Sequence, residues 1–191
     1  LLLGAAPAHG APLLTTEVPR AFVDFNRAET ELDPALIAGA PRQAGNPRVA
    51  SGLGVIARVV AQGRPLYRGP LTLAEAEARI ARYWRPWHAA LAGMMAQQPE
   101  VIAAVEAVLR SEGLRVARNA PFAGAYTAQA YGRPAEGWQV VQVEIDRRLY
   151  LDEPRVEPGP GFDAFARVMD RVVAGLADLG RTAPDLAMAA E

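Results

Sequence analysis

Carboxylates and arginines are the reactive side chains that this 191-residue sequence offers. The chain has no Cys, its 20 basic residues are all Arg, and it contains only two His. Without Cys or Lys there is no thiol nucleophile and no amine for a Schiff base. Ser51 lies in a Gly-rich turn without a nucleophile-elbow pattern, which argues against a Ser-His-Asp triad. Carboxylate, guanidinium and metal-bound water remain as candidate reagents.

One candidate carboxylate, Glu144, belongs to the segment 137–150. Val141, Val143 and Ile145 alternate with polar residues, and this period of two predicts a β-strand. A carboxylate near the end of a largely apolar strand is costly to desolvate, so it is usually paired or functional. Two interpretations are therefore open: a functional Glu144, or an amphipathic edge strand with a solvated polar face.

A second segment built on the same plan, 18–27, ends in Asn26 and Arg27. In open α/β sheets, ligands gather at the carboxyl ends of the strands. Arg27 is a natural partner for a planar carboxylate, because a guanidinium can bind both oxygens at once. The alternative is an ordinary salt bridge with one of three acidic neighbours, Asp24, Glu29 and Glu31.

The clearest helix among the elements that must position these groups spans residues 71–95. Thr72 and Glu75 predict a capping box at its start. Apolar residues at spacings of three and four predict one buried stripe: Leu73, Ala76, Ile80, Tyr83, Trp87, Leu91 and Met94. Pro86 is expected to kink or restart the helix. His88 is expected to be a buried, hydrogen-bonded structural residue, since no second metal ligand lies at helical spacing.

Elsewhere, predicted strands alternate with predicted helices, which is typical of an α/β domain. The expected strands are 13–18, 21–25, 52–60, 114–119 and 137–150, and the further helices are 99–112 and 162–179. Length and a 51% hydrophobic fraction suit one domain. A net charge of −1 predicts neither a nucleic-acid partner nor an acidic membrane partner. Residues 1–10 lack the basic start of a signal peptide, and the protein is expected to be cytoplasmic.

Four segments carry a resemblance to the N-formylglutamate amidohydrolase family: 18–27, 83–91, 118–124 and 142–150. They follow that family's order. The resemblance implies a three-layer α/β/α fold with a mostly parallel or mixed central sheet, similar to the carboxypeptidases and other phosphorylase/hydrolase-like enzymes. It also implies a zinc-dependent hydrolase that cleaves the formamide of N-formyl-L-glutamate, a small acidic N-acyl amino acid, to formate and L-glutamate.

The resemblance assigns roles to particular residues. Glu144 matches the family's general base, and Asn26 with Arg27 matches the pair that holds a substrate carboxylate. Three further residues are expected to line the pocket: Arg58, Asn119 and Gly124.

The family's two expected sources of zinc ligands do not occur in this sequence. They are a Pro-His-Ser-Gly motif on the first strand and an Asp-x-His-Ser-Met motif after the Trp/His helix, so no residue is nominated as a metal ligand. We expect one hydrolase domain over 1–191, with an N-terminal segment and a segment near residues 95–99 missing. The second gap predicts a break between Met95 and Pro99. Two alternatives stay open: a non-catalytic binding module for acidic amino-acid derivatives, and a zinc hydrolase of another N-acyl amino acid or a γ-glutamyl peptide.

Overall fold

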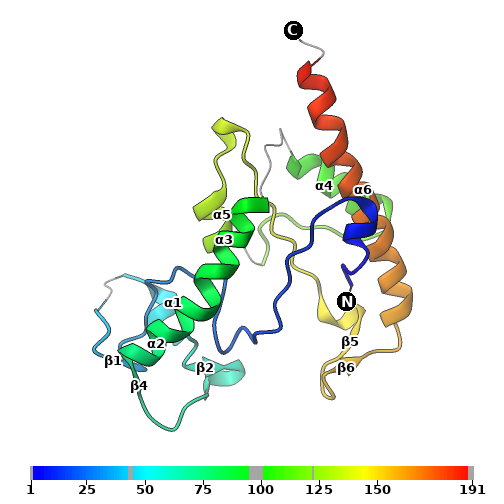
Figure 1. Cartoon of the computed structure of the whole chain (residues 1–191). Coiled ribbons are helices and arrows are strands. Elements are labelled where there is room, and N and C mark those ends of the chain that lie inside the picture. Colours follow the sequence, from blue (N-terminus) through cyan, green and yellow to red (C-terminus); the bar gives the residue numbers. More distant parts are fainter. Residues whose placement is uncertain (1, 43–44, 95–100, 122, 189–191) are drawn as a thin grey trace. The chain divides into compact units, whose positions relative to one another are not determined.

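A computed structural model describes residues 2–42, 45–94, 101–121 and 123–188 of the chain (Figure 1). The chain divides into two compact units. Unit 1 comprises Leu1–Leu13, Ala96–Gly124 and Tyr131–Glu191, and unit 2 comprises Leu14–Met95 and Ala125–Ala130. Each unit has its own cluster of buried hydrophobic residues. The predicted break between Met95 and Pro99 lies outside the described residues.

Unit 2 is built around a long helix that begins with the predicted capping box. It runs through α2 (Leu73–Arg79), the π-helical turn η3 (Ile80–Trp84) and α3 (Arg85–Met94). The Glu75 N–H donates to Thr72 Oγ1 at 3.1 Å, and the Thr72 N–H donates to Glu75 Oε2 at 2.8 Å. The helix and its N-terminal cap are therefore confirmed.

The disturbance predicted at Pro86 takes the form of the π-helical turn η3, which directly precedes it. Proline has no N–H to donate to the carbonyl four residues earlier, and a locally wider turn accommodates that gap. After Ile80 the buried residues are Trp84 and, as predicted, His88, whereas Tyr83 and Trp87 of the predicted stripe are only partly buried against the same core.

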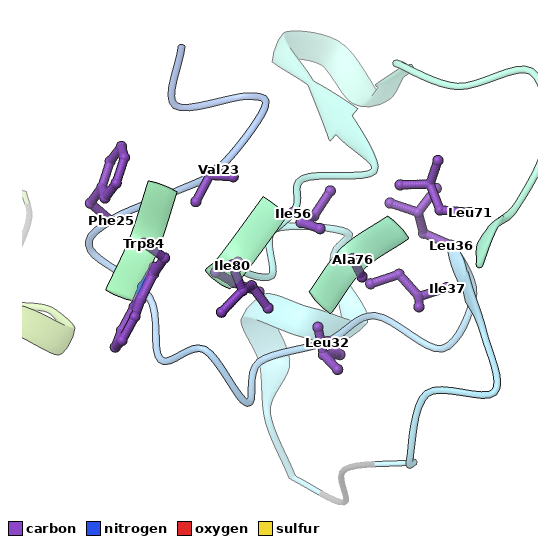
Figure 2. Packing of buried hydrophobic residues seen from close by; sticks show 11 residues of the cluster. Val23, Phe25, Leu32, Leu36, Ile37, Ile56, Leu71, Ala76, Ile80 and Trp84 are labelled. Atoms are coloured by element: carbon purple, nitrogen blue, oxygen red, sulfur yellow. The ribbon is translucent and has the colours of Figure 1, made fainter. Parts of the chain in front are cut away.

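Short strands and turns complete unit 2. These elements are β1 (Ile37–Ala38), α1 (Pro47–Ala50), β2 (Val59–Val60), η2 (Ala61–Gly63), β3 (Arg64–Pro65), β4 (Leu71–Thr72) and the greater part of α5 (Tyr126–Tyr131). β1 pairs in parallel with β4, and β2 pairs antiparallel with β3. Figure 2 shows the core that forms where these segments meet the helix, with Val23, Ile56 and Leu32 around Ile80 and Ala76.

Unit 1 is centred on two helices that pack through apolar side chains. Its elements are η1 (Ala6–His9), α4 (Val101–Ser111), η4 (Pro134–Glu136), η5 (Arg147–Leu149), β5 (Leu151–Asp152), β6 (Glu157–Pro158) and α6 (Phe162–Met188). Val105 and Leu109 of α4 share a cluster with Phe165 and Met169 of α6. α4 ends at Ser111, one residue before its predicted end, and Gly113, expected to cap it, has a φ of +77° that suits glycine. The last helix, by contrast, continues beyond its predicted end at residue 179.

Most of the predicted strands are wrong in detail. Within the described residues, 13–18, 21–25, 114–119 and 139–146 are not strands, and only β2 falls within 52–60. An extended segment becomes a strand only when a neighbour pairs with its backbone groups, and the alternating pattern does not show whether that neighbour exists.

Helices combined with a parallel strand pair make the fold α/β, as predicted. The three layers remain a prediction. Within the described ranges, every helix falls short of the length or the hydropathy needed to cross a bilayer.

Gly54 offers a test of the core of unit 2. Its neighbour Val55 donates its N–H to the Glu31 carbonyl at 2.8 Å, and a Cβ built on Gly54 would overlap that carbonyl oxygen. Gly54→Ala should therefore lower the free energy of unfolding by about 1–3 kcal/mol, as overpacking does. Urea denaturation checks this. Gly69→Ala, whose Cβ would meet open space, is the matched control, and equal stability of the two variants would contradict the close approach.

Candidate functional site

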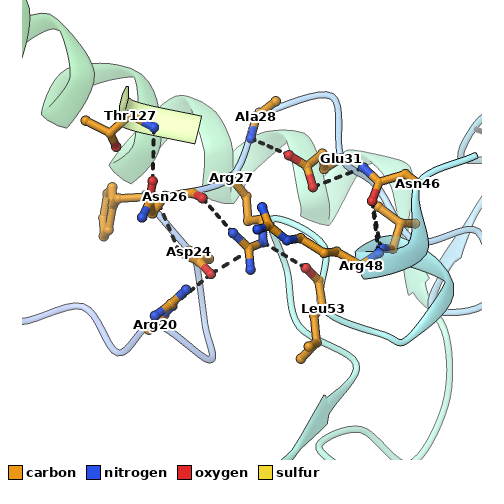
Figure 3. A network of polar contacts seen from close by, with 12 residues as sticks. Arg20, Asp24, Asn26, Arg27, Ala28, Glu31, Asn46, Arg48, Leu53 and Thr127 are labelled. Carbon is orange, nitrogen blue, oxygen red and sulfur yellow. Dashed lines mark hydrogen bonds and ion pairs between the residues drawn. The ribbon is translucent and has the colours of Figure 1, made fainter. Parts of the chain in front are cut away.

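The segment Asp24 to Arg27 forms a tight turn in unit 2 (Figure 3). The Asp24 carboxylate accepts the Asn26 N–H at 2.9 Å, and the Asp24 carbonyl accepts the Arg27 N–H at 3.2 Å. Before the turn, the Asp24 N–H donates to the Val55 carbonyl at 2.8 Å. The turn is thus joined to the core, and the predicted pair Asn26 and Arg27 lies at its end.

Two aromatic side chains of the long helix hold the turn by its carbonyl groups. The indole N–H of Trp84 donates to the Arg27 carbonyl at 2.9 Å, and His88 Nε2 lies 2.9 Å from the Phe25 carbonyl. Because a carbonyl can only accept, the proton of His88 is on Nε2. Desolvation by burial lowers the pKa of His88, although the Phe25 carbonyl and Glu29 oppose the shift. His88 is therefore a buried, hydrogen-bonded structural residue, as predicted.

An aromatic cluster joins this helix to α5. The rings of Trp84 and His88 have centroids 3.8 Å apart, and each also contacts Tyr126, at 5.7 and 5.6 Å. The next residue, Thr127, donates its backbone N–H to Asn26 Oδ1 at 3.0 Å. Since Oδ1 accepts this bond, the orientation of the Asn26 amide is fixed, with Oδ1 facing the Thr127 N–H.

Arg27 is buried, with 8% of its surface exposed, and carbonyl oxygens hold its guanidinium. Nε donates to the Leu53 carbonyl at 3.1 Å, and Nη1 donates to the Asn26 carbonyl at 2.9 Å. Among the described residues, Nη2 has no hydrogen-bond acceptor. Burial lowers the pKa of Arg27, and Asp24 opposes that shift, but a guanidinium stays charged in proteins.

The salt-bridge alternative for Arg27 is confirmed only in a loose form. Asp24 Oδ2 lies 3.9 Å from Arg27 Nε, but the same oxygen lies 2.8 Å from Arg20 Nε. Glu29 instead pairs with Arg85 at 2.8 Å. No carboxylate in the described structure therefore neutralises Arg27 at hydrogen-bonding distance.

Arg58 occupies a different part of unit 2. Its Nε donates to Asp33 Oδ2 at 2.7 Å, and Asp33 is buried. Both line a cavity of about 630 Å³, together with Asn46 and Arg42. Arg58 therefore lines a cavity, but Asn26 and Arg27 are not among its lining residues in the described structure.

The other predicted site residues belong to unit 1. Glu144 is exposed, and Gln142 Nε2 donates to its Oε1 at 2.5 Å. Val143 beside it is 44% exposed, whereas Val141 packs against the core of unit 1. Asn119, with φ of +55°, and Gly124 are also exposed. The functional roles proposed for these residues remain predictions.

The described residues do not fit a zinc site. Among them, no three His, Cys, Asp or Glu side chains are grouped so that they could hold a metal ion. His9 contacts Asp170 at 2.9 Å in unit 1, and His88 is bonded to the Phe25 carbonyl in unit 2. No catalytic step is therefore derived through a metal.

Sequence reasoning missed the groups that hold Asn26 and Arg27. Asp24 gave a usable signal, because an Asp two residues before a turn residue often accepts its N–H. Trp84 and His88 lie one turn apart, but the sequence did not show that both donate to carbonyl groups of this segment. Leu53 and Thr127 act through backbone groups, which no side-chain pattern reveals.

Comparisons with known proteins point to the same family as the four segments of the sequence that carry the resemblance. The sequence profile of the N-formylglutamate amidohydrolase family matches residues 1–99 and 95–151. The chain is also similar to the crystal structure of N-formylglutamate amidohydrolase from Ralstonia eutropha JMP134, with 29% identity and a TM-score of 0.86, over 95% of this chain and 81% of that one. A search of curated proteins found no match.

Two tryptophans test the bond that holds the turn. Trp84→Phe removes the donor to the buried Arg27 carbonyl, so unfolding free energy should fall by about 1–3 kcal/mol beyond the loss of ring volume. Trp87→Phe is the control, because the Trp87 indole N–H is buried and, in the described structure, has no hydrogen-bond partner. Urea denaturation compares the two variants. A loss for Trp87→Phe as large as that for Trp84→Phe would show that ring packing, not the bond, stabilises the turn.

Proposed function

This chain belongs to the N-formylglutamate amidohydrolase family, and on that basis we propose that it cleaves the formamide of N-formyl-L-glutamate to formate and L-glutamate. The family places it among enzymes that hydrolyse amides. The observation that carries the substrate assignment is the buried Arg27. Its charge is held in place by neutral carbonyl groups and is not consumed by an internal carboxylate.

Arg27 and Asn26 bind one substrate carboxylate in this proposal. The guanidinium supplies charge-assisted hydrogen bonds from Nη2, and the family resemblance assigns Asn26 to the same carboxylate. Both side chains are held before the ligand arrives, Arg27 by Leu53 and Asn26 by Thr127. Little side-chain entropy is then lost on binding, which favours affinity and fixes the orientation of the substrate.

Glu144 acts as the general base. It takes a proton from the water that attacks the formyl carbon, and it returns that proton to the amide nitrogen as the C–N bond breaks. The water oxygen leaves in formate, and the nitrogen leaves as the amino group of glutamate. The family resemblance of 142–150 supports this role.

Zinc dependence and a cytoplasmic location are proposed from the family resemblance and the composition alone. A second function, a non-catalytic module that binds acidic amino-acid derivatives, is favoured by the lack of a metal-binding group among the described residues. Formate release from N-formyl-L-glutamate by the full chain, together with its zinc content, separates the two. Formate formed in step with glutamate supports the enzyme, and binding without formate supports the module. Neither binding nor release would contradict both.

Removing Arg27 tests carboxylate recognition. In Arg27→Ala the lost charge-assisted contact should reduce kcat/KM for N-formyl-L-glutamate by about 10–150-fold, equivalent to about 1.5–3 kcal/mol. Arg68→Ala, at an exposed position in unit 2, is the control and should behave as wild type. A parallel assay uses an N-formyl amino acid with an uncharged side chain. An equal loss on both substrates indicates the shared α-carboxylate as the partner, whereas unchanged activity on both rejects the role of Arg27.

Glu144→Gln tests the general base. The substitution keeps the shape and the hydrogen-bonding reach of the side chain but removes its basicity, so kcat should fall about 10²–10⁴-fold. The unfolding midpoint should stay unchanged because Glu144 is exposed. Glu157→Gln, at an exposed position of β6, serves as the control. Full activity in Glu144→Gln would support the alternative that its segment presents only a solvated polar face.

A further inference from the structure

The network around Arg27 carries an excess of positive charge. Figure 3 places three arginines, Arg20, Arg27 and Arg48, together with two carboxylates, Asp24 and Glu31. Asp24 already bonds the Asn26 N–H and the guanidinium of Arg20. These five side chains therefore sum to one net positive charge, and Arg48 is the one of the three arginines that forms no ion pair with either carboxylate in the described structure.

Glu31 forms no ion pair with Arg48 in the described structure, and neutral donors, one from the backbone and one from an amide, bond its two oxygens. Oε1 accepts the Ala28 N–H at 3.1 Å, and Oε2 accepts Asn46 Nδ2 at 3.2 Å. These bonds make Glu31 a support for Asn46, whose own Oδ1 caps the helix that carries Arg48.

The backbone of Arg48 is fixed close to Arg27. Asn46 Oδ1 accepts the Arg48 N–H at 3.0 Å, and the Arg48 carbonyl accepts the Leu53 N–H at 2.8 Å. The Leu53 carbonyl in turn accepts Arg27 Nε at 3.1 Å. A single residue, Leu53, thus links the two arginines, and Figure 3 shows the Arg48 side chain extending from α1 toward Arg27.

Electrostatics agree with this placement. The positive charge of Arg48 is near enough to contribute to the lowering of the Arg27 pKa, after burial, the larger cause. Arg48 is exposed, and among the described residues its guanidinium makes no hydrogen bond or ion pair. Two neighbouring cations repel each other, and an anion bound between them removes that repulsion.

We propose that Arg48 determines substrate specificity by binding the second carboxylate of a dicarboxylic substrate, while Arg27 and Asn26 bind the first. The inference rests on the proposed function and extends it, because N-formyl-L-glutamate carries two carboxylates and Arg27 can balance only one. A substrate with a single carboxylate would leave the Arg48 charge without a partner. The preference for acidic over neutral side chains is then located in one residue of α1.

Calorimetric binding of glutarate and of its monoamide to the full chain tests this inference. Both probes lack the formamide bond, so binding is measured apart from hydrolysis. Wild type should bind glutarate about 10-fold or more tightly than the monoamide, the usual effect of a charge-assisted contact. In Arg48→Gln the difference should shrink towards unity. Arg48→Lys, which keeps the charge, should retain part of it.

Arg64→Gln, an exposed arginine of β3, is the matched control and should keep the wild-type preference. An undiminished preference in Arg48→Gln overturns the inference, and so does equal binding of the two probes by wild type. Neither result touches the proposed function, which is judged separately by formate release from N-formyl-L-glutamate. Formate release with no role for Arg48 would leave the enzyme assignment standing and reject only the second carboxylate site.

Discussion

Two buried carbonyl groups, those of Phe25 and Arg27, set the constraint on which unit 2 depends. A tight turn that enters a core must find hydrogen-bond donors for its backbone oxygens, because an unsatisfied buried polar group is costly. His88 and Trp84 supply these donors from one row of the long helix. The helix and the turn are therefore fixed against each other by directional bonds as well as by apolar packing, and the direction of the Arg27 side chain follows from both.

A π-helical turn, η3, interrupts the long helix shortly before Pro86. Beyond Ile80, the residues four and eight positions on, Trp84 and His88, are buried, and Tyr83 and Trp87 are partly buried against the same core. Positions three, four, seven and eight residues on all belong to the apolar face of a helix. The start of the helix follows from local chemistry in the sequence, the capping box of Thr72 and Glu75. Periodicity could not show which side chains of this face donate hydrogen bonds to the turn.

The sequence predicted less about the strands than about the helix. Alternation in 137–150 predicted a β-strand with Val141, Val143 and Ile145 on its core face, but only Val141 and Ile145 pack against the core of unit 1 and no strand forms over 139–146, because a ladder also requires a neighbouring backbone. The residues of the candidate site likewise include some that the sequence predicted and one that it did not. Asn26 and Arg27 were predicted from residue type and position at the end of a segment. Arg48 was not, because its significance arises from Leu53 and Asn46, which bring it to Arg27 through backbone and cap hydrogen bonds.

The way Arg27 is held explains how a buried cation can stay ready for a ligand. Had Asp24 formed a close two-point pair with Arg27, a substrate carboxylate would have to break that pair before binding. Asp24 is instead drawn towards Arg20, and carbonyl dipoles from Leu53 and Asn26 stabilise the guanidinium without cancelling its charge. The carbonyl dipoles of Leu53 and Asn26 fix the direction of the Arg27 side chain, and the positive charge of its guanidinium can still attract an anion. A nearby Arg48 strengthens that field, so the affinity of the site should depend on the charge of the ligand more steeply than one arginine alone would allow.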